Sequence, residues 1–100
     1  MPDERAEYRL APEAREDLET VWLYSIEQWG LKRANRYIDD VADAFAYLTA
    51  YPMDGTACDH IRDGYRRYPV IRHIIYYRIT DYGIAVVRVL HDRMLPSRHL

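Results

Sequence analysis

Two amphipathic stripes separated by one glycine constrain the fold of this chain most strongly. Apolar residues repeat every three or four positions up to Trp29, and the same spacing returns over residues 34–48. Gly30 lies between the stripes, and glycine readily adopts the conformation that ends a helix. We therefore expect a first helix over residues 12–29 and a second that ends before Tyr51-Pro52, joined as an antiparallel hairpin. We interpret their aromatic residues as core rather than as a ligand pocket.

The remaining segments predict strands around this hairpin. Residues 8–11 form a short alternating segment, and residues 53–64 are polar with glycines, which is typical of a loop. Three later segments are dense in Val, Ile and Tyr: "YRRYPV", "RHIIYYRIT" and "GIAVVRVLH". The "TDYG" between the last two predicts a hairpin turn. The order β-α-α-β-β-β predicts one α+β domain over residues 1–100, with the helical hairpin packed on one face of a mostly antiparallel sheet.

The last strand is apolar on both faces, which is typical of a central strand. Strict alternation would place Ala85, Val87, Val89 and His91 on one face, and Ile84, Val86, Arg88 and Leu90 on the other. Arg88 is a charge in mid-strand, so we expect it to form a structural ion pair. Pro69 indicates that its strand lies near an edge or a break in pairing.

Charge is distributed unevenly along the chain. Residues 1–50 carry 6 Lys+Arg against 11 Asp+Glu, whereas residues 51–100 carry 8 against 5. Only Lys32 is a lysine, and the arginine fork suits paired contacts to carboxylates and phosphates. The chain also holds 10 tyrosines, several of them in its arginine-rich second half. That half predicts a surface for an anionic partner, while the net charge of −2 argues against an indiscriminate nucleic-acid binder.

The compartment follows from three features of the sequence. No apolar stretch approaches the roughly 18 residues that a membrane-spanning helix needs. The segment "MPDERAEYRL" is acidic and lacks the apolar core of an export signal. Cys58 is the one cysteine, so no internal disulfide is possible. These features predict a cytoplasmic protein without a membrane segment.

Acid–base chemistry on RNA is the enzymatic alternative. His91 could exchange protons with a 2′-hydroxyl or the leaving oxygen, with Asp59 or Asp92 as the second acid–base group, and an arginine could stabilise the phosphorane charge. The candidate arginines are Arg66, Arg67, Arg72, Arg78 and Arg93. Such neighbours arise by chance in a chain with 4 histidines and 13 arginines, so their spacing alone does not establish a site. No phosphate loop or metal-ligand spacing appears, so we expect no cofactor and no metal.

Four segments carry a similarity to known proteins when they are taken in order. They are "YRLAPEAREDLETVWLYSIEQWG", "ANRYIDDVADAFAYLTAYPMDG", "IRDGYRRYPVIRHIIYYRI" and "IAVVRVLHDRMLPSRHL". Together they span nearly the whole chain and resemble the RelE/ParE superfamily of type II toxin–antitoxin toxins, its ParE branch in particular. The resemblance implies a bacterial growth-inhibiting toxin that a cognate antitoxin neutralises.

The resemblance leaves three readings open. ParE-like members are associated with poisoning of DNA gyrase, which implies an inhibitor rather than a catalyst. RelE-like members cut messenger RNA on the ribosome, which here would use His91 and Arg67. Those members tend to be strongly basic, so the net charge of −2 favours the gyrase reading. The third reading is a decayed toxin that only binds antitoxin.

The resemblance also implies partners and surfaces. The antitoxin is expected to be small, with an acidic C-terminal segment and a ribbon-helix-helix DNA-binding start, and to form a hetero-oligomer with this chain. The chain alone is not expected to bind specific DNA sequences. We expect antitoxin contacts in the groove of the helical hairpin and on the arginine- and tyrosine-rich strands, at Arg66, Arg67, Tyr68, Arg72, Tyr76 and Arg78. Pro96 blocks strand continuation, so we expect target contacts in an exposed basic tail, at His91, Arg93, Met94, Leu95 and Arg98.

Overall fold

The computed structural model describes residues 6–100. Residues 1–5, which hold half of the acidic N-terminal segment and the start of the predicted domain, lie outside the described residues. The elements are β1 (Glu7–Leu10), α1 (Pro12–Trp29), α2 (Leu31–Ala50), η1 (Pro52–Asp54), β2 (Thr56–Ala57), β3 (Tyr65–Val70), β4 (His73–Ile79), β5 (Gly83–His91) and η2 (Pro96–Arg98). The predicted α+β order is confirmed, with the two-residue strand β2 added inside the predicted loop.

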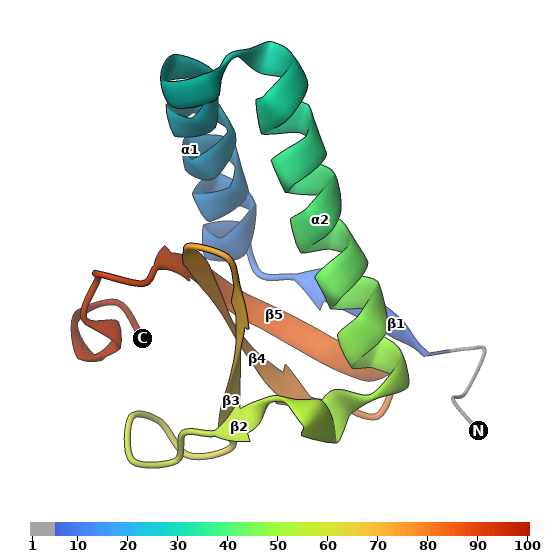
Figure 1. Ribbon diagram of the computed structural model, residues 1–100. Helices are drawn as coiled ribbons and strands as arrows, with labels where there is room; N and C mark the ends of the chain where they lie inside the picture. The colour runs from blue at the N-terminus through green and yellow to red at the C-terminus, as the bar shows by residue number, and fades with distance from the viewer. Residues whose placement is uncertain (1–5) are drawn as a thin grey trace.

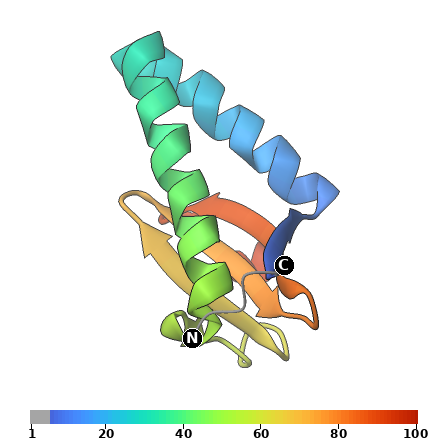
Figure 2. The same ribbon diagram turned by 90° about the vertical axis from the view of Figure 1, so that its right-hand side faces the viewer.

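The helical hairpin turns at Gly30, as the sequence indicates. Gly30 has a φ of 90°, and its N–H donates to the carbonyl of Ile26 at 2.8 Å, which closes α1. Because α2 starts one residue later, the two helices run antiparallel. The stripe of α2 is buried against α1 and the sheet, and both helices lie over one face of that sheet (Figures 1 and 2).

The five strands form one sheet in the order β1-β5-β4-β3-β2. Only the pairing of β1 with β5 is parallel, so the sheet is mostly antiparallel and β5 lies inside it, as predicted. The pairing of β2 with β3 covers Arg66 and Arg67 alone. Pro69 therefore lies where β3 has no outer neighbour among the described residues, which confirms the expected edge position.

The predicted alternation along β5 is wrong beyond Val86. Tyr77 pairs with Val86 and Tyr76 with Arg88, so Val87 is an extra residue that forms a β-bulge. The bulge reverses the faces that follow it. Val89 consequently joins Val86 in the core under the helices, although strict alternation placed these two residues on opposite faces.

A second, smaller core covers the other face of the sheet. It consists of Cys58, Tyr76 and Leu90, against which pack the loop before β3 and the C-terminal Leu100. In Figure 1 that loop and the C-terminal segment lie on the side of the sheet away from the helices. Burial raises the pKa of the Cys58 thiol, so this cysteine is an inert core residue. No helix within residues 6–100 is both long and apolar enough to cross a membrane.

Candidate functional site

The ends of β4 and β5 bring two histidines together beside the helical hairpin. His73 begins β4 and pairs directly with His91, the last residue of β5. Their rings meet edge to face with centroids 5.3 Å apart. The Tyr37 hydroxyl, on α2, lies 2.6 Å from His73 Nδ1 and also 3.1 Å from the carbonyl oxygen of Val70. His73 is thereby fixed between the helix and the sheet.

The two histidines differ in environment. His73 is buried, and burial lowers its pKa from 6.5 to about 4, with a smaller contribution of the same sign from the neighbouring His91. His73 is therefore neutral at physiological pH. His91 is half-buried, and its Nδ1 accepts the backbone N–H of Arg93 at 3.1 Å and lies 3.0 Å from Asp92 Oδ1. These contacts fold the chain back immediately after β5.

Two hollows of about 220 and 250 Å³ open beside these histidines and share Tyr24, His73 and His91. We call them together the histidine groove. Its first part is mainly apolar and is also lined by Asp17, Thr20, Val21, Val89, Leu90 and Met94. Its second part is polar and cationic, and is also lined by Ser25, Gln28, Trp29, Arg72 and Arg93. The groove can thus hold a ligand that carries both apolar and anionic groups.

A bidentate ion pair fixes the edge of this groove. Arg88 donates from Nε and Nη2 to the two carboxylate oxygens of Asp17 at 2.7 and 2.8 Å. Asp17 also accepts the backbone N–H of Val89 at 2.9 Å, and Arg88 Nη1 donates to the carbonyl of His99 at 2.9 Å. The expected structural ion pair of Arg88 is confirmed, and it links α1, β5 and the C-terminal segment.

The residues expected to bind an antitoxin do not share one surface. Arg67 and Arg78 are exposed on the face away from the helices, whereas Arg66 turns to the other face and donates to the carbonyls of Met53 and Gly55. Tyr68 is half-buried beside Tyr47, and Arg72 is exposed in the β3–β4 turn. Tyr76 must be corrected: it is 2% exposed in the second core, so its side chain offers no contact surface.

The residues expected to contact the target do gather in one segment. His91 ends β5, and Arg93, Met94, Leu95 and Arg98 are exposed in the turn and η2 that follow. Met94 also lines the histidine groove, so groove and tail form one continuous surface.

The alternative catalytic pair of His91 and Arg67 is separated by the sheet. Arg67 pairs with Tyr76, which belongs to the core away from the helices, whereas His91 pairs with His73 on the helix side. Two residues that pair directly across neighbouring strands point to the same face of the sheet. Arg67 and His91 therefore lie on opposite faces. Arg72 and Arg93, not Arg67, are the arginines that share a hollow with His91.

Sequence reasoning missed several residues of the groove. Trp29 was interpreted as core and Tyr24 was not singled out, but both are partly exposed. His73 was not singled out, although a histidine opening an apolar strand requires a polar partner, which Tyr37 provides. Within residues 6–100 no three His, Cys, Asp or Glu side chains converge in a way that could hold a metal ion.

The sequence is similar to a known protein family and to individual members of it. The family described as "ParE toxin of type II toxin-antitoxin system, parDE" matches residues 8–96. The chain is 42% identical to Toxin ParE1 of Mycobacterium tuberculosis and 32% identical to Toxin ParE1 of Caulobacter vibrioides. Both alignments cover 93% of this chain and 96% of the relative.

A solved structure supports the fold independently. A chain of the chromosomal ParDE TA system from P. aeruginosa superposes with a TM-score of 0.75 over 89% of this chain and 98% of that one, at 14% identity. At that identity the likeness concerns the fold alone. The match to the family over nearly the whole chain is decisive: this chain belongs to the ParE family of type II toxin–antitoxin toxins.

Proposed function

We propose that this protein stops bacterial growth by binding DNA gyrase through its C-terminal segment, and that a cognate antitoxin neutralises it. The observation that carries the proposal is the exposed segment after β5. Met94 and Leu95 are 38% and 56% exposed there, between the cationic Arg93 and Arg98. Exposed apolar residues flanked by arginines are typical of protein-binding surfaces.

The segment is also held in place rather than free. His91 accepts the N–H of Arg93, the N–H of Met94 donates to the carbonyl of His91 at 3.0 Å, and Arg88 binds the carbonyl of His99. A surface that is ordered before binding loses less conformational entropy on association. This supports direct contact with a protein target.

A gyrase assay with purified protein tests the proposal. The wild-type protein should inhibit supercoiling or accumulate cleavage complexes, and the double change Met94→Ser with Leu95→Ser should remove this effect. Ile79→Ser is the matched control. Ile79 is also an exposed apolar residue, but it ends β4, whereas the C-terminal segment follows His91, which pairs with the first residue of β4. Gyrase that works normally at toxin concentrations that stop growth would refute the proposal.

The antitoxin is proposed to be a small protein with an acidic C-terminal segment and a DNA-binding start. The exposed cations Arg67, Arg72 and Arg78 remain its proposed contacts on the strands, together with Arg66 and Tyr68. Co-purification of the neighbouring gene product with this chain tests the partnership. Charge reversal at Arg67 or Arg78 tests the contact surface.

One observation favours a second candidate function, a ribosome-associated endoribonuclease. The polar hollow places His91 beside Arg72 and Arg93, which supply an acid–base group and two cations. The proposal predicts cleavage of messenger RNA within codons on expression, and loss of that cleavage in His91→Ala. Intact transcripts in arrested cells would exclude it.

A further inference from the structure

We propose that the tip of the molecule is a docking surface for a short acidic peptide segment that carries one large apolar side chain. We call this surface the cationic tip; it consists of Trp29, Lys32, Arg33, Arg36, Ile71 and Arg72. It lies where the β3–β4 turn packs beside the closed end of the helical hairpin, next to the turn at Gly30. The proposal refines the antitoxin partnership proposed above by naming where the acidic segment binds, so it rests on that part of the proposed function.

The cationic tip is hollowed around Trp29. One hollow of about 310 Å³ lies between the helices and the turn and is lined by Trp29, Arg33, Arg36, Ile71 and Arg72, with Tyr37 and Asp40. A second hollow of about 600 Å³ is lined by Trp29, Lys32, Arg33 and Arg36. Both hollows are therefore lined by Trp29 together with several cationic side chains, and Tyr37 adds a second aromatic residue to the first. This combination fits an apolar side chain flanked by carboxylates.

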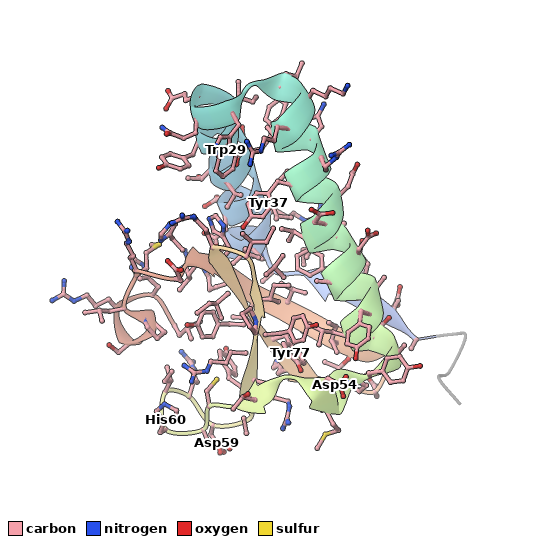
Figure 3. The ribbon with its side chains drawn as sticks, viewed as in Figure 1. Trp29, Tyr37, Asp54, Asp59, His60 and Tyr77 are labelled. Carbon is pink, nitrogen blue, oxygen red and sulfur yellow. The ribbon has the colours of Figure 1, made fainter. Side chains whose placement is uncertain are left out.

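Trp29 has the geometry of an anchor point. It is 39% exposed at the end of α1, and its ring meets that of Tyr37 edge-on at 6.1 Å, which fixes its orientation. The Arg33 guanidinium carbon lies 5.2 Å from the Trp29 ring centroid. Figure 3 shows Trp29 and Tyr37 in the space between the two helices. A rigid aromatic residue beside arginines is the composition of binding hot spots.

The cations of the tip have no anionic partners in the fold. Within residues 6–100 the ion pairs are Arg9–Glu7, Arg88–Asp17 and the contact of His91 with Asp92, so none involves a cation of the tip. Asp40 is the one carboxylate that lines the hollows of the tip. The tip therefore retains positive charge that a partner can neutralise, although the whole chain carries −2.

Ile71 adds an observation that folding alone does not explain. This β-branched residue has a φ of 52°, in the left-handed region that side chains of its kind rarely adopt, and it is 74% exposed. Asparagine or glycine would occupy this turn with less strain. A strained and exposed apolar residue on the rim of a hollow is therefore best explained by a contact with a partner.

The surroundings of the tip favour a short peptide over a nucleic acid. The next turns of α2 expose Asp39, Asp40 and Asp43, which would repel a longer run of phosphates. Trp29 and Ile71 offer apolar surface that a phosphate backbone does not use. A segment of a few acidic residues around one apolar side chain satisfies both conditions.

Selection from short random peptides displayed on phage tests the proposal, with the full-length protein immobilised. Peptides with Asp or Glu flanking an aromatic or aliphatic residue should be enriched. A fluorescent synthetic copy of an enriched peptide should bind Arg33→Glu at least about tenfold more weakly, because the mutation replaces attraction by repulsion. Ile71→Gly should also bind more weakly while remaining folded, since it relieves the strained φ. Arg15→Glu, the same charge change on an exposed part of α1 away from the tip, should bind normally.

Several outcomes would overturn the docking surface. Two of them concern the selection: enrichment of peptides without acidic residues, or no enrichment at all. The other two concern the synthetic peptide: equal binding to Arg33→Glu and to the wild type, or displacement of the peptide by a single-stranded oligonucleotide at a lower concentration than unlabelled peptide requires. Loss of binding in Arg67→Glu instead would place the segment on the strands. Growth arrest and gyrase inhibition are measured separately with Arg33→Glu, so a failure of the docking surface is distinguishable from a failure of the proposed function.

Discussion

Stability should depend on pH through His73. The folded chain binds a proton on this imidazole only near pH 4, because burial and the neighbouring His91 lower its pKa, whereas the unfolded chain binds it near 6.5. Between these values the unfolded state holds more protons, so stability is complete above pH 6.5 and is lost as the pH falls towards 4. At about 1.4 kcal/mol per pKa unit, the loss from this one group amounts to about 3 kcal/mol.

Urea unfolding of the wild type and His73→Gln between about pH 7 and about pH 4 measures this loss. Glutamine does not titrate and keeps an amide for the Tyr37 hydroxyl, so its profile contains every other titrating group. The difference in free energy of unfolding between the two proteins should shift by about 3 kcal/mol in favour of the variant at the acidic end of the range. His60→Gln, in an exposed loop, should follow the wild type. A gap that does not change with pH would show that His73 is not buried as described.

Three further predictions concern contacts that hold the fold. Asp17→Ala removes the acceptor of three hydrogen bonds and should cost about 3 kcal/mol in urea unfolding, while adding Arg88→Leu should restore part of it because no unpaired charge remains. Gly83→Ala should lower stability by about 2 kcal/mol or more in thermal unfolding, because the added Cβ would collide with the backbone of Glu7 and because Gly83 has a φ of 141°, which alanine rarely adopts. Ile71→Gly should keep or raise stability, by up to about 1 kcal/mol in urea unfolding, because it relieves the left-handed φ.

Local periodicity was enough to locate most elements. The proline at position 12 and the glycine at position 30 bound α1 as predicted, because both residues act through their own backbone conformation. The three long strands also lie in the predicted segments, since β-branched and aromatic residues cluster there. The short strand β2 carries no such pattern; it forms only because β3 offers it an edge.

The bulge at Val87 was not predictable, because both faces of β5 are apolar. A one-residue shift along a strand can normally be recognised in the sequence, because it moves apolar residues to the solvent-exposed face. In β5 both faces pack against a core, so the pattern does not change. The same limit applies to Arg88. Its sequence context required a carboxylate, yet only the packing of α1 on β5 identifies Asp17, which lies 71 residues away.

The candidate surfaces could not be predicted from the sequence for a different reason: the helical hairpin is longer than the sheet that it covers. In Figure 1 the hairpin extends past the sheet, so the apolar stripe of α1 continues where no strand lies beneath it. Val21 is buried over the sheet, while Tyr24 and Trp29, one and two turns further on, are partly exposed. A periodic stripe states which face of a helix is apolar but not where its cover ends. The overhang therefore leaves aromatic residues of α1 exposed, and it places them beside Arg72 and His73, which the β3–β4 hairpin brings to the same end of the molecule.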